Sequence, residues 1–300
     1  MPIFRGMGRA FTVGAYRDRS GCYPMFRPQE TISSREAEFL QGLRDWIRQY
    51  STVCVAYSGG VDSTLVAAIA HEQLGDAALA VTGVSPALAP HLLDEARGQA
   101  RWSGVRHREC ATTELQDPAY SNNPTDRCFA CKRELHLHLR PIAAAAGDAL
   151  VIDGVNRDDL GDHRPGIDAA RQAGVRSPLA ELGIDKTMIR RLSQALGFPW
   201  WDKPAQPCLA SRFPYGENIS AERLKRVGRA EAWLIARGFP RVRVRCQGLS
   251  ARIEVPQERL SDLLSQSQSE AMVQSFLDLG FTSVSLDLEG LISGKLNREL

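Results

Sequence analysis

Short apolar runs alternate with segments of helical periodicity along the first two-thirds of the chain. The helical periodicity begins after Ser33, which we expect to cap a helix. Apolar, β-branched runs without that periodicity predict buried parallel strands. They lie at 53–57, 77–84 and 149–153, and a further strand is expected at 107–111. Strands that alternate with helices predict an α/β fold with a doubly wound, mostly parallel sheet, whose ligand lies outside the carboxyl ends of the strands.

The last third of the chain has a different pattern, which predicts a smaller C-terminal α+β domain. Ser220 is expected to cap an amphipathic helix. Two strands, a helix and a last strand then follow at 242–244, 253–255, 260–279 and 284–288. The domains that we predict are a loosely ordered, arginine-rich extension at 1–32, the doubly wound domain at 33–205 and the C-terminal domain at 206–300.

The composition is that of an ordinary globular protein. The chain has 300 residues, and its 37 lysines and arginines against 35 acidic residues give a net charge of +2, which does not indicate a nucleic-acid partner. No apolar run approaches the roughly 18 residues that cross a bilayer, and no signal-peptide pattern is present, so we expect a cytoplasmic protein without a membrane partner. Seven cysteines, an odd number, favour thiols, metal ligands or nucleophiles over a disulfide framework.

A candidate phosphate site directly follows the first strand, in the stretch Ser58-Gly59-Gly60-Val61-Asp62-Ser63. Gly59 and Gly60 allow an anion to approach the backbone, and the N–H groups of the next helix face it. Ser58 and Ser63 add hydroxyl donors. Asp62 would be repelled by phosphates unless it held a metal ion, so we interpret it as a Mg²⁺ contact. An ordinary βα turn remains the alternative, and the Gly-Lys-Ser/Thr ending of the other common phosphate loop is absent.

Cys128 and Cys131 form a second candidate site. Two cysteines at this spacing can turn both sulfurs to one side and ligate zinc or an iron–sulfur cluster. Arg127, Lys132 and Arg133 would favour the thiolate forms. A structural zinc site would need two more ligands, for which the two histidines that follow closely are candidates. A redox dithiol is the other alternative.

Two polar segments further along complete the set of candidates. The stretch 153–166 is dense in acidic groups and follows the fourth strand, so we expect it, with Ser85 after the second strand, to lie near the nucleotide. The stretch 200–216 contains several prolines together with aromatic, basic and thiol groups, which favours a pocket wall over a helix. Cys208 is alone there, and a buried apolar cysteine is the alternative interpretation.

Together these motifs resemble those of the LarE family, within the PP-loop ATP pyrophosphatase superfamily. The resemblance runs from about residue 33 to the end, and it includes Lys203-Pro204, Cys208-Leu209-Ala210-Ser211-Arg212 and Arg243-Val244-Arg245. Family members are ATP-dependent sulfur transferases that make pyridinium-3,5-bisthiocarboxylic acid mononucleotide, the organic part of the nickel-pincer cofactor of lactate racemase. The resemblance implies that the doubly wound domain binds ATP and that the C-terminal domain serves sulfur transfer and substrate binding.

The resemblance also implies a two-step reaction. ATP, with Mg²⁺, adenylates a carboxylate of a mononucleotide substrate, and sulfur then displaces AMP. In some members the cysteine at the Cys208 position gives up its own sulfur and becomes dehydroalanine. In others, cysteines at the positions of Cys128, Cys131 and Cys208 hold a [4Fe-4S] cluster that carries the transferable sulfide. This chain has all three, so we favour the cluster and keep the sacrificial Cys208 as the alternative.

The residues and the resemblance together give a set of predicted site residues. The catalytic residues are Cys208 and Asp62. The nucleotide and its Mg²⁺ are assigned to Ser58, Gly59, Gly60, Asp62, Ser63, Ser85, Asp153, Asn156 and Asp159. Substrate binding is assigned to Arg212, Arg243, Arg245 and Arg252, because arginine suits a phosphate. Metal ligands are assigned to Cys128, Cys131, Cys208 and Glu231. Sulfide or a cysteine desulfurase as sulfur source, and a homo-oligomer, are further expectations.

Two other enzyme classes stay open. A tRNA-thiolating enzyme of the same superfamily can also use three cysteines and a cluster, but it would usually bring an RNA-binding domain or further CxxC pairs. An amide-forming ATP pyrophosphatase, like the synthetases of NAD or GMP, would leave the cysteines incidental.

Overall fold

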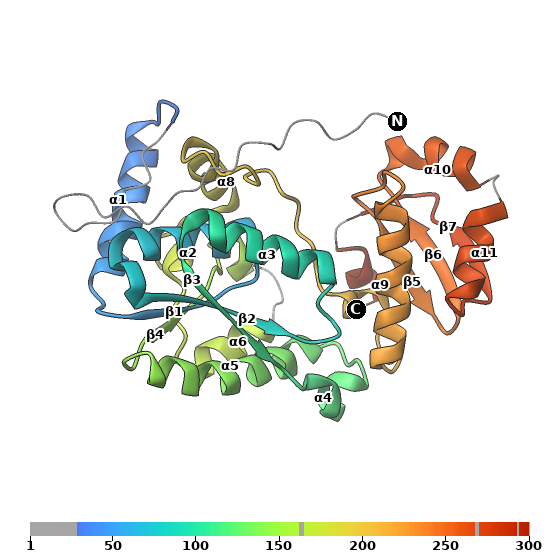
Figure 1. Cartoon of the computed structure of the whole chain (residues 1–300), viewed down its shortest axis with the longest axis horizontal. Helices are drawn as coiled ribbons and strands as arrows, with labels where there is room; N and C mark the ends of the chain where they lie inside the picture. Colours follow the sequence, from blue (N-terminus) through green and yellow to red (C-terminus); the bar gives the residue numbers. More distant parts are fainter. Residues whose placement is uncertain (1–28, 162–164, 268–269, 293, 300) are drawn as a thin grey trace.

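The computed structural model describes residues 29–161, 165–267, 270–292 and 294–299. These residues form two units that lie end to end along the long axis (Figure 1). A four-stranded sheet and its helices make the large unit, and a three-stranded sheet and its helices make the small unit. The predicted α/β fold with a smaller C-terminal part is thereby confirmed. The boundary at residue 206 stays a prediction, and most of the predicted N-terminal extension lies outside the described residues.

The large sheet is fully parallel, in the order β3-β2-β1-β4. Its strands are β1 (Val53–Ala56), β2 (Ala78–Val84), β3 (Arg106–Ala111) and β4 (Leu150–Ile152). Val53 of β1 pairs with Ala78 of β2 on one side and with Leu150 of β4 on the other. The chain therefore leaves β1 toward β2 and β3, and it returns to the opposite side for β4. This reversal makes the sheet doubly wound, as predicted, and places a switch point beside the end of β1.

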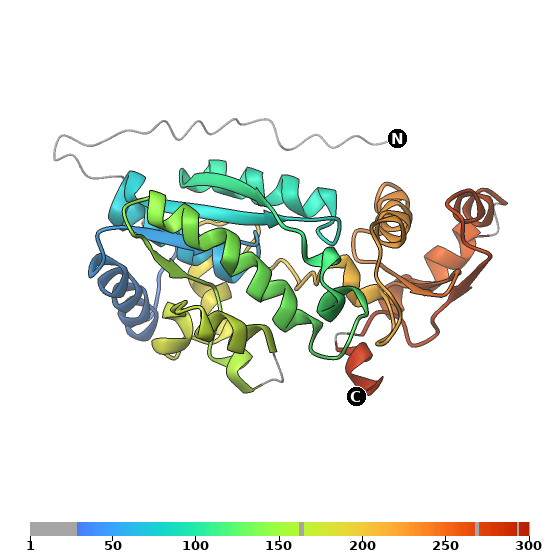
Figure 2. The same ribbon diagram turned by 90° about the horizontal axis from the view of Figure 1, so that it is seen from below.

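Helices cover both faces of the large sheet (Figure 2). One face carries α1 (Ser34–Arg48), α2 (Val61–Leu74), α3 (Pro90–Ser103) and α8 (Lys186–Ala195); the other carries α5 (Arg127–Ala145) and α6 (Pro165–Gln172). The predicted cap of α1 is a capping box: the Glu36 N–H donates to the Ser33 hydroxyl (3.2 Å), and the Ser33 N–H donates to the Glu36 carboxylate. Two short helices, α4 (Pro118–Ser121) and α7 (Pro178–Glu181), lie in the connections.

The small unit packs α9 (Ala221–Ile235) against a mixed sheet of order β5-β6-β7. The strands are β5 (Arg243–Gln247), β6 (Ser250–Glu254) and β7 (Ser283–Leu286). Ser220 caps α9, as predicted, by accepting from the Arg223 N–H (3.3 Å). The single helix predicted over 260–279 is instead described as α10 (Leu260–Ser267) and α11 (Glu270–Asp278). No helix in the described part of the chain is both long and apolar enough to cross a membrane.

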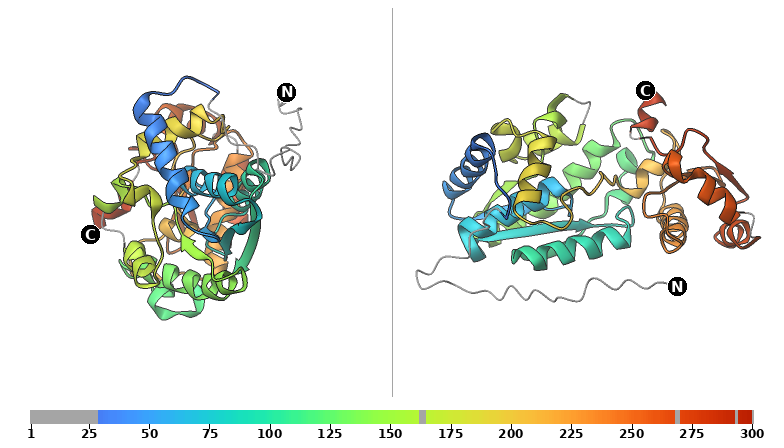
Figure 3. Two further views of the ribbon diagram at one scale, coloured as in Figure 1. Left: turned by 90° about the vertical axis from the view of Figure 1, so that its left-hand side faces the viewer. Right: turned by 90° about the horizontal axis from the view of Figure 1, so that it is seen from above.

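The two units share apolar contacts. Leu209, Phe213 and Leu224 of the small unit belong to one buried cluster with Ala87 and Leu92 of the large unit. Figure 3 shows the small unit at one end of the large unit, with α9 on the side nearer to it. Leu209 and Phe213 are therefore buried against the large unit. The chain after position 200 passes from one unit to the other at this buried cluster.

The start of the described chain also contacts the large unit. The Gln29 N–H donates to the Ala195 carbonyl (2.6 Å), and Glu30 pairs with Arg191 of α8 (2.9 Å). Two polar contacts therefore connect the end of the predicted extension to α8, and its loose order stays a prediction.

Helix α5 buries His136, one of the two histidines that follow the CxxC motif. Its side chain is 7% exposed, and neither ring nitrogen has a hydrogen-bond partner among the described residues. Burial lowers the pKa of His136 to about 4, whereas an unfolded histidine titrates near pH ~6.5. Between these two values the unfolded chain binds a proton that the folded chain does not. The free energy of unfolding therefore falls as the pH falls through this window, by at most about 3 kcal/mol.

We expect His136→Leu to remove this part of the pH dependence. Denaturant titrations from neutral pH down to about pH 4 should show a shallower loss of stability in the variant than in the wild type. His138→Leu is the control, because His138 is more exposed and lies beside Glu134 (3.0 Å). Equal pH slopes in the wild type and His136→Leu would contradict the prediction.

Candidate active site

The predicted phosphate loop joins β1 to α2 at the carboxyl edge of the large sheet. The Ser58 N–H donates to the Ser63 hydroxyl oxygen (3.3 Å), the two serine hydroxyls share a hydrogen bond (3.0 Å), and the Ser63 hydroxyl donates to the Gly60 carbonyl (3.2 Å). These bonds fix the turn. Gly60 is the N-cap of α2 and has no side chain to occupy the first N–H groups of the helix. Those groups are therefore available to a phosphate.

Two glycines let neighbouring backbone pack closely against this loop. Gly59 has a positive φ of +68°, and a Cβ there would lie 2.7 Å from the Ala96 Cβ of α3. Gly154 belongs to the turn after β4, and a Cβ there would lie 2.6 Å from the Ser63 backbone nitrogen. The turn after β4 thus touches the start of α2, as we expected for two neighbouring strand ends.

Asp62 lies among polar groups from two other segments. It forms an ion pair with Lys186 of α8, and the Asn156 amide lies at 3.5 Å as a donor to its carboxylate. Asp159 accepts from the Asn156 N–H (3.1 Å). The structure therefore brings Asp62, Asn156 and Asp159 together, as predicted. Lys186 is a counter-cation that the sequence reasoning did not assign, and a Mg²⁺ ion on Asp62 would share or replace its contact.

Asp153 and Ser85 lie at the carboxyl ends of β4 and β2. Asp153 accepts from the Ser177 hydroxyl (2.7 Å) and the Val155 N–H (3.1 Å), and burial raises the pKa of its carboxyl. The Ser85 hydroxyl oxygen accepts from the Ala87 N–H (3.2 Å). Both side chains therefore stabilise their own turns at the predicted edge. Their contact with the nucleotide stays a prediction.

Lys203 connects the phosphate loop to the segment that carries Cys208. Its Nζ donates to the Gly59 carbonyl (3.2 Å) and forms an ion pair with Glu95 of α3. Further along the same segment, the Leu209 N–H donates to the Ala87 carbonyl just after β2 (2.9 Å). The segment therefore runs along the carboxyl edge of the sheet, from the phosphate loop to the second unit.

The three predicted cluster cysteines meet at this edge from two places. Cys128 and Cys131 lie near the start of α5, and Cys208 precedes the short helix Leu209–Arg212. Cys128 and Cys208 are exposed, whereas Cys131 is partly covered. The pKa of the Cys131 thiol is raised to about 12, mainly by burial and further by the nearby charges of Cys208 and Glu114. The charges of Cys128 and Cys208 therefore both act on Cys131.

Whether the three thiols hold an iron–sulfur cluster stays a prediction, and two features of this donor set bear on it. Among the residues that the structure describes, no three histidine, cysteine or acidic side chains lie close enough together to hold one metal ion. In a cubane cluster the iron atoms occupy separate corners, so their thiolates lie further apart than the ligands of a single ion. Three thiols also leave one iron without a protein ligand.

Glu231, predicted as a metal contact, is held by Arg212. The Arg212 guanidinium donates from Nε to Oε1 (2.8 Å) and from Nη2 to Oε2 (3.0 Å), and the Val244 N–H also donates to Oε1 (2.9 Å). Both side chains are buried. A metal ion on Glu231 would have to share these oxygens with a bidentate partner, and this role stays a prediction.

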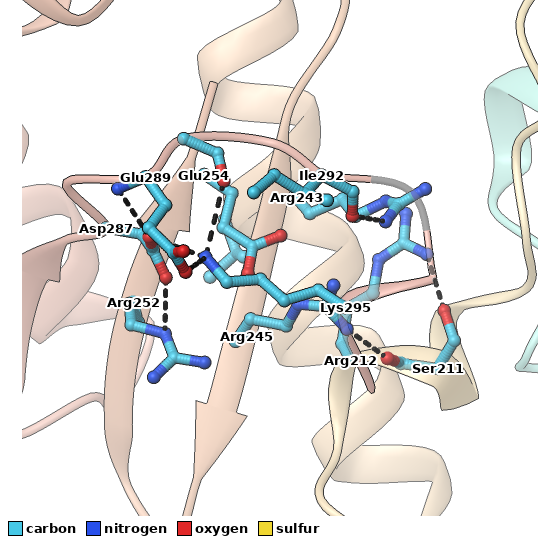
Figure 4. Close-up of polar contacts among 12 residues, drawn as sticks. Ser211, Arg212, Arg243, Arg245, Arg252, Glu254, Asp287, Glu289, Ile292 and Lys295 are labelled. Atoms are coloured by element: carbon cyan, nitrogen blue, oxygen red, sulfur yellow. Dashed lines mark hydrogen bonds and ion pairs between the residues drawn. The ribbon is translucent and has the colours of Figure 1, made fainter. Parts of the chain in front are cut away.

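Three of the four predicted substrate arginines, Arg243, Arg245 and Arg252, share one face of the small sheet, and Arg212 lies in the short helix before α9 (Figure 4). Arg243 and Arg245 alternate along β5, and Arg252 of β6 stands opposite Arg245. They do not border one hollow, however. Arg245 and Arg252 line one pocket and Arg243 lines another, with Arg212 at the wall of both.

We call the first of these the small-sheet pocket. It is lined by Arg245, Arg252, Ser285 and Lys295, among others, and has a volume of about 390 Å³. Each of its cations already has an acidic partner: Arg245 with Glu254 (3.0 Å), Arg252 with Asp287 (3.3 Å), and Lys295 with Asp287 (2.6 Å) and Glu289 (3.2 Å). An anion that binds in this pocket competes with these carboxylates.

The second is the inter-unit pocket, with a volume of about 310 Å³. His91 and Arg190 line it from the large unit, and Arg212, Glu231 and Arg243 line it from the small unit. Residues 204–207, between Lys203 and Cys208, form part of its wall. The pocket is therefore next to both the segment from the phosphate loop and the cysteine site.

Comparison with known proteins decides the family. No protein-family model matches the chain. The chain is 38% identical over 272 residues to the pyridinium-3,5-bisthiocarboxylic acid mononucleotide synthase of Lactiplantibacillus plantarum, a match that covers 90% of this chain and 96% of that protein. The chain belongs to the LarE family. Two uncharacterised proteins are also similar to this LarE-family chain: one of Synechocystis at 53% identity over 87% of the chain and 97% of that protein, and one of Methanocaldococcus jannaschii at 27% over 79% and 89%.

Sequence reasoning missed the lysines of this LarE-family site. Lys186 and Arg190 could be placed on one helix face from their spacing, but their partners lie in other segments: Lys186 faces Asp62, and Arg190 lines the inter-unit pocket. Lys203 and Lys295 likewise meet their partners through the fold. A carboxylate at the start of a phosphate-loop helix needs a cation, and this requirement was the signal that could have led to a search for Lys186.

Proposed function

We propose that this LarE-family protein is an ATP-dependent sulfur transferase that adenylates a carboxylate of a pyridinium mononucleotide and then replaces AMP with sulfur. The observation that carries the proposal is the placement of the phosphate loop and the three cysteines at the same sheet edge. Lys203 and Leu209 hold the intervening segment against that edge. The named relative, a pyridinium-3,5-bisthiocarboxylic acid mononucleotide synthase, supplies the product class.

The adenylation step belongs to the loop between β1 and α2. The free N–H groups at the start of α2, with the Ser58 hydroxyl, are placed to hold the phosphates of ATP. Asp62 and Asn156 would hold Mg²⁺, which when bound neutralises phosphate charge. A substrate carboxylate oxygen bonds to the α-phosphorus, and the bond to pyrophosphate breaks. Lys186 keeps Asp62 in place before the metal ion binds.

The sulfur step belongs to the cysteine site. Cys128, Cys131 and Cys208 would hold a [4Fe-4S] cluster, which when bound supplies a transferable sulfide. The sulfur bonds to the adenylated carboxyl carbon, and the carbon–oxygen bond to AMP breaks, so the exchange involves no net oxidation or reduction. The partly covered Cys131 side chain would fix one ligand, while the exposed Cys128 and Cys208 would leave the substrate side accessible.

A sacrificial Cys208 is the second candidate, and the exposure of Cys208 at the segment beside the inter-unit pocket favours it. In that case the Cys208 sulfur bonds to the acyl carbon of the adenylate and the bond to AMP breaks, which gives a thioester and free AMP. Loss of the Cα proton to a base and cleavage of the Cβ–S bond then leave a thiocarboxylate and dehydroalanine. Intact mass after the reaction distinguishes the two: a protein lighter by the mass of H₂S identifies the sacrificial donor, and an unchanged mass with bound iron identifies the cluster.

The adenylation half is tested by substrate-dependent release of pyrophosphate from ATP. We expect the wild type to release pyrophosphate only when the carboxylate substrate and Mg²⁺ are present. Asp62→Asn removes the charge that holds Mg²⁺ and should slow the release by roughly a hundredfold. Asp76→Asn is the matched control, because Asp76 lies in the turn after α2, at the other end of that helix. Release that does not depend on the carboxylate substrate would contradict the proposal.

A further inference from the structure

Two arginines from different units meet in the inter-unit pocket without an acidic partner. Arg243 is 8% exposed; it donates to the Ile292 carbonyl (3.4 Å), and it forms no ion pair within the described part of the chain. Arg190 of α8 lines the same pocket, and its Nε is buried with no hydrogen-bond partner among the described residues. A buried guanidinium donor without an acceptor is costly, so a ligand that supplies acceptors here is stabilised.

The charge of the pocket points to the kind of ligand. Four arginines line it, Arg190, Arg212, Arg241 and Arg243, whereas Glu231 is the acidic residue in its lining and is already held by Arg212. Burial lowers the pKa of the neighbouring His91, which favours its neutral form. Burial, and then the charges of Arg212 and Arg245, lower the pKa of Arg243. An anion would relieve this repulsion.

The contrast with the small-sheet pocket strengthens the assignment. That pocket contains as many basic groups, but its arginines and lysine are neutralised by Glu254, Asp287 and Glu289. An anion gains less there, because it must displace a carboxylate that the protein already provides. In the inter-unit pocket the guanidinium groups of Arg190 and Arg243 have no carboxylate partner among the described residues. Residues 204–207 form part of the wall of this pocket and lie beside the carboxyl edge of the large sheet.

The resemblance already assigns substrate binding to Arg212 and Arg243; we propose that Arg190 of α8 is a further substrate-binding residue, by which the large unit holds an anionic oxygen group of the substrate, a carboxylate or a phosphate monoester, opposite Arg243 in the inter-unit pocket. The proposal rests on the proposed function for the identity of the substrate, but not for the presence of the anion site. Arg190 and Arg243 belong to different units, and the segment that carries Cys208 connects these units. A group bound to both arginines therefore also restricts the position of that segment. Arg190 is then a substrate-binding residue in a helix whose first turn carries Lys186, the partner of Asp62.

The test is binding without ATP, sulfur or turnover. Isothermal titration of the wild type with inorganic phosphate and with pyridine-3,5-dicarboxylate, at low and constant salt, identifies which oxygen group the pocket takes. In Arg190→Gln we expect the affinity for that probe to fall by roughly ten- to a hundredfold, the loss typical of hydrogen bonds to a charged group. Arg190→Lys keeps the charge but loses the planar fork, so an intermediate loss is expected.

Arg191→Gln is the matched control, because Arg191 is the next residue of α8 and pairs with Glu30 and Glu36, away from the pocket. Its affinity for the probe should equal that of the wild type. The proposal is overturned if neither probe binds the wild type, or if Arg190→Gln binds as tightly as Arg191→Gln. Since no step of adenylation or sulfur transfer enters the assay, either result is distinguishable from a failure of the proposed reaction.

Discussion

Cys208→Ala is expected to abolish formation of the thiocarboxylate while ATP-dependent release of pyrophosphate continues. Cys208 lies at the end of the segment that begins at Lys203 beside the phosphate loop, and it is exposed. Its sulfur is needed in both versions of the sulfur step, as a ligand of the cluster or as the donor itself. The predicted phosphate loop contacts the start of this segment at Lys203 and not its cysteine end, so adenylation should proceed. The measurement is product mass together with pyrophosphate from one reaction.

The control for this variant is Cys110→Ala. Cys110 is also a free cysteine with partial exposure, but it lies in β3 and packs with Cys54 and Leu135. Its loss should leave both products unchanged. If Cys208→Ala still makes the thiocarboxylate, the sulfur step does not pass through this site. If the wild type makes no sulfur product but forms an amide from ammonia, the chain is an amide-forming relative.

Gly154→Ala is expected to remove most of the adenylation activity, by roughly a hundredfold or more, which is the scale of loss when reacting groups are misplaced by about 1 Å. The new Cβ would lie 2.6 Å from the Ser63 nitrogen and 2.8 Å from its Cα, and both are backbone atoms that cannot rotate away. The phosphate loop or the turn after β4 must shift. The N–H groups at the start of α2 would then be misaligned with the phosphates that we propose they bind.

Gly161→Ala is the matched control for Gly154→Ala. It lies in the same polar segment after β4, and a Cβ there would meet no atom of the described residues within 4 Å. Pyrophosphate release and the affinity for ATP should be measured for both variants, with thermal unfolding as a check that each is folded. A folded Gly154→Ala protein that releases pyrophosphate at the wild-type rate would show that the close packing of this turn is not needed for catalysis.

Much of this fold could be predicted from local pattern, because its determinants are local. The capping box at Ser33 is contained in four residues, and the apolar strands β1, β2 and β4 have ends within one residue of their predicted positions. The ends of the small-sheet strands differ from the prediction by up to three residues, because their alternating pattern marks strand ends less sharply. The parallel order of the sheet follows from the crossovers between them. The helix predicted over 260–279 is described as α10 and α11, on either side of residues 268–269, which lie outside the described residues.

The candidate site was predictable where a single segment forms it and not where separate segments meet. Asp62 and the glycines of the loop could be assigned from one motif. Lys186, which pairs with Asp62 from 124 residues away, could not, because spacing gives a helix face but not what it faces. The division of the arginines between two pockets could not be predicted from the sequence either. Arg243 and Arg252 share a sheet face, but residues of the large unit line the pocket of Arg243 and not that of Arg252.

The central claim is that ATP-driven activation and sulfur transfer occur on one substrate at one sheet edge. It is tested most directly by an anaerobic reaction of the protein with ATP, Mg²⁺ and pyridinium-3,5-dicarboxylic acid mononucleotide, in which thiocarboxylate and pyrophosphate are measured in the same sample. We expect the two products in equal amounts, and neither without ATP. A sulfur-containing product without pyrophosphate, or pyrophosphate with no sulfur in the product, would contradict the account.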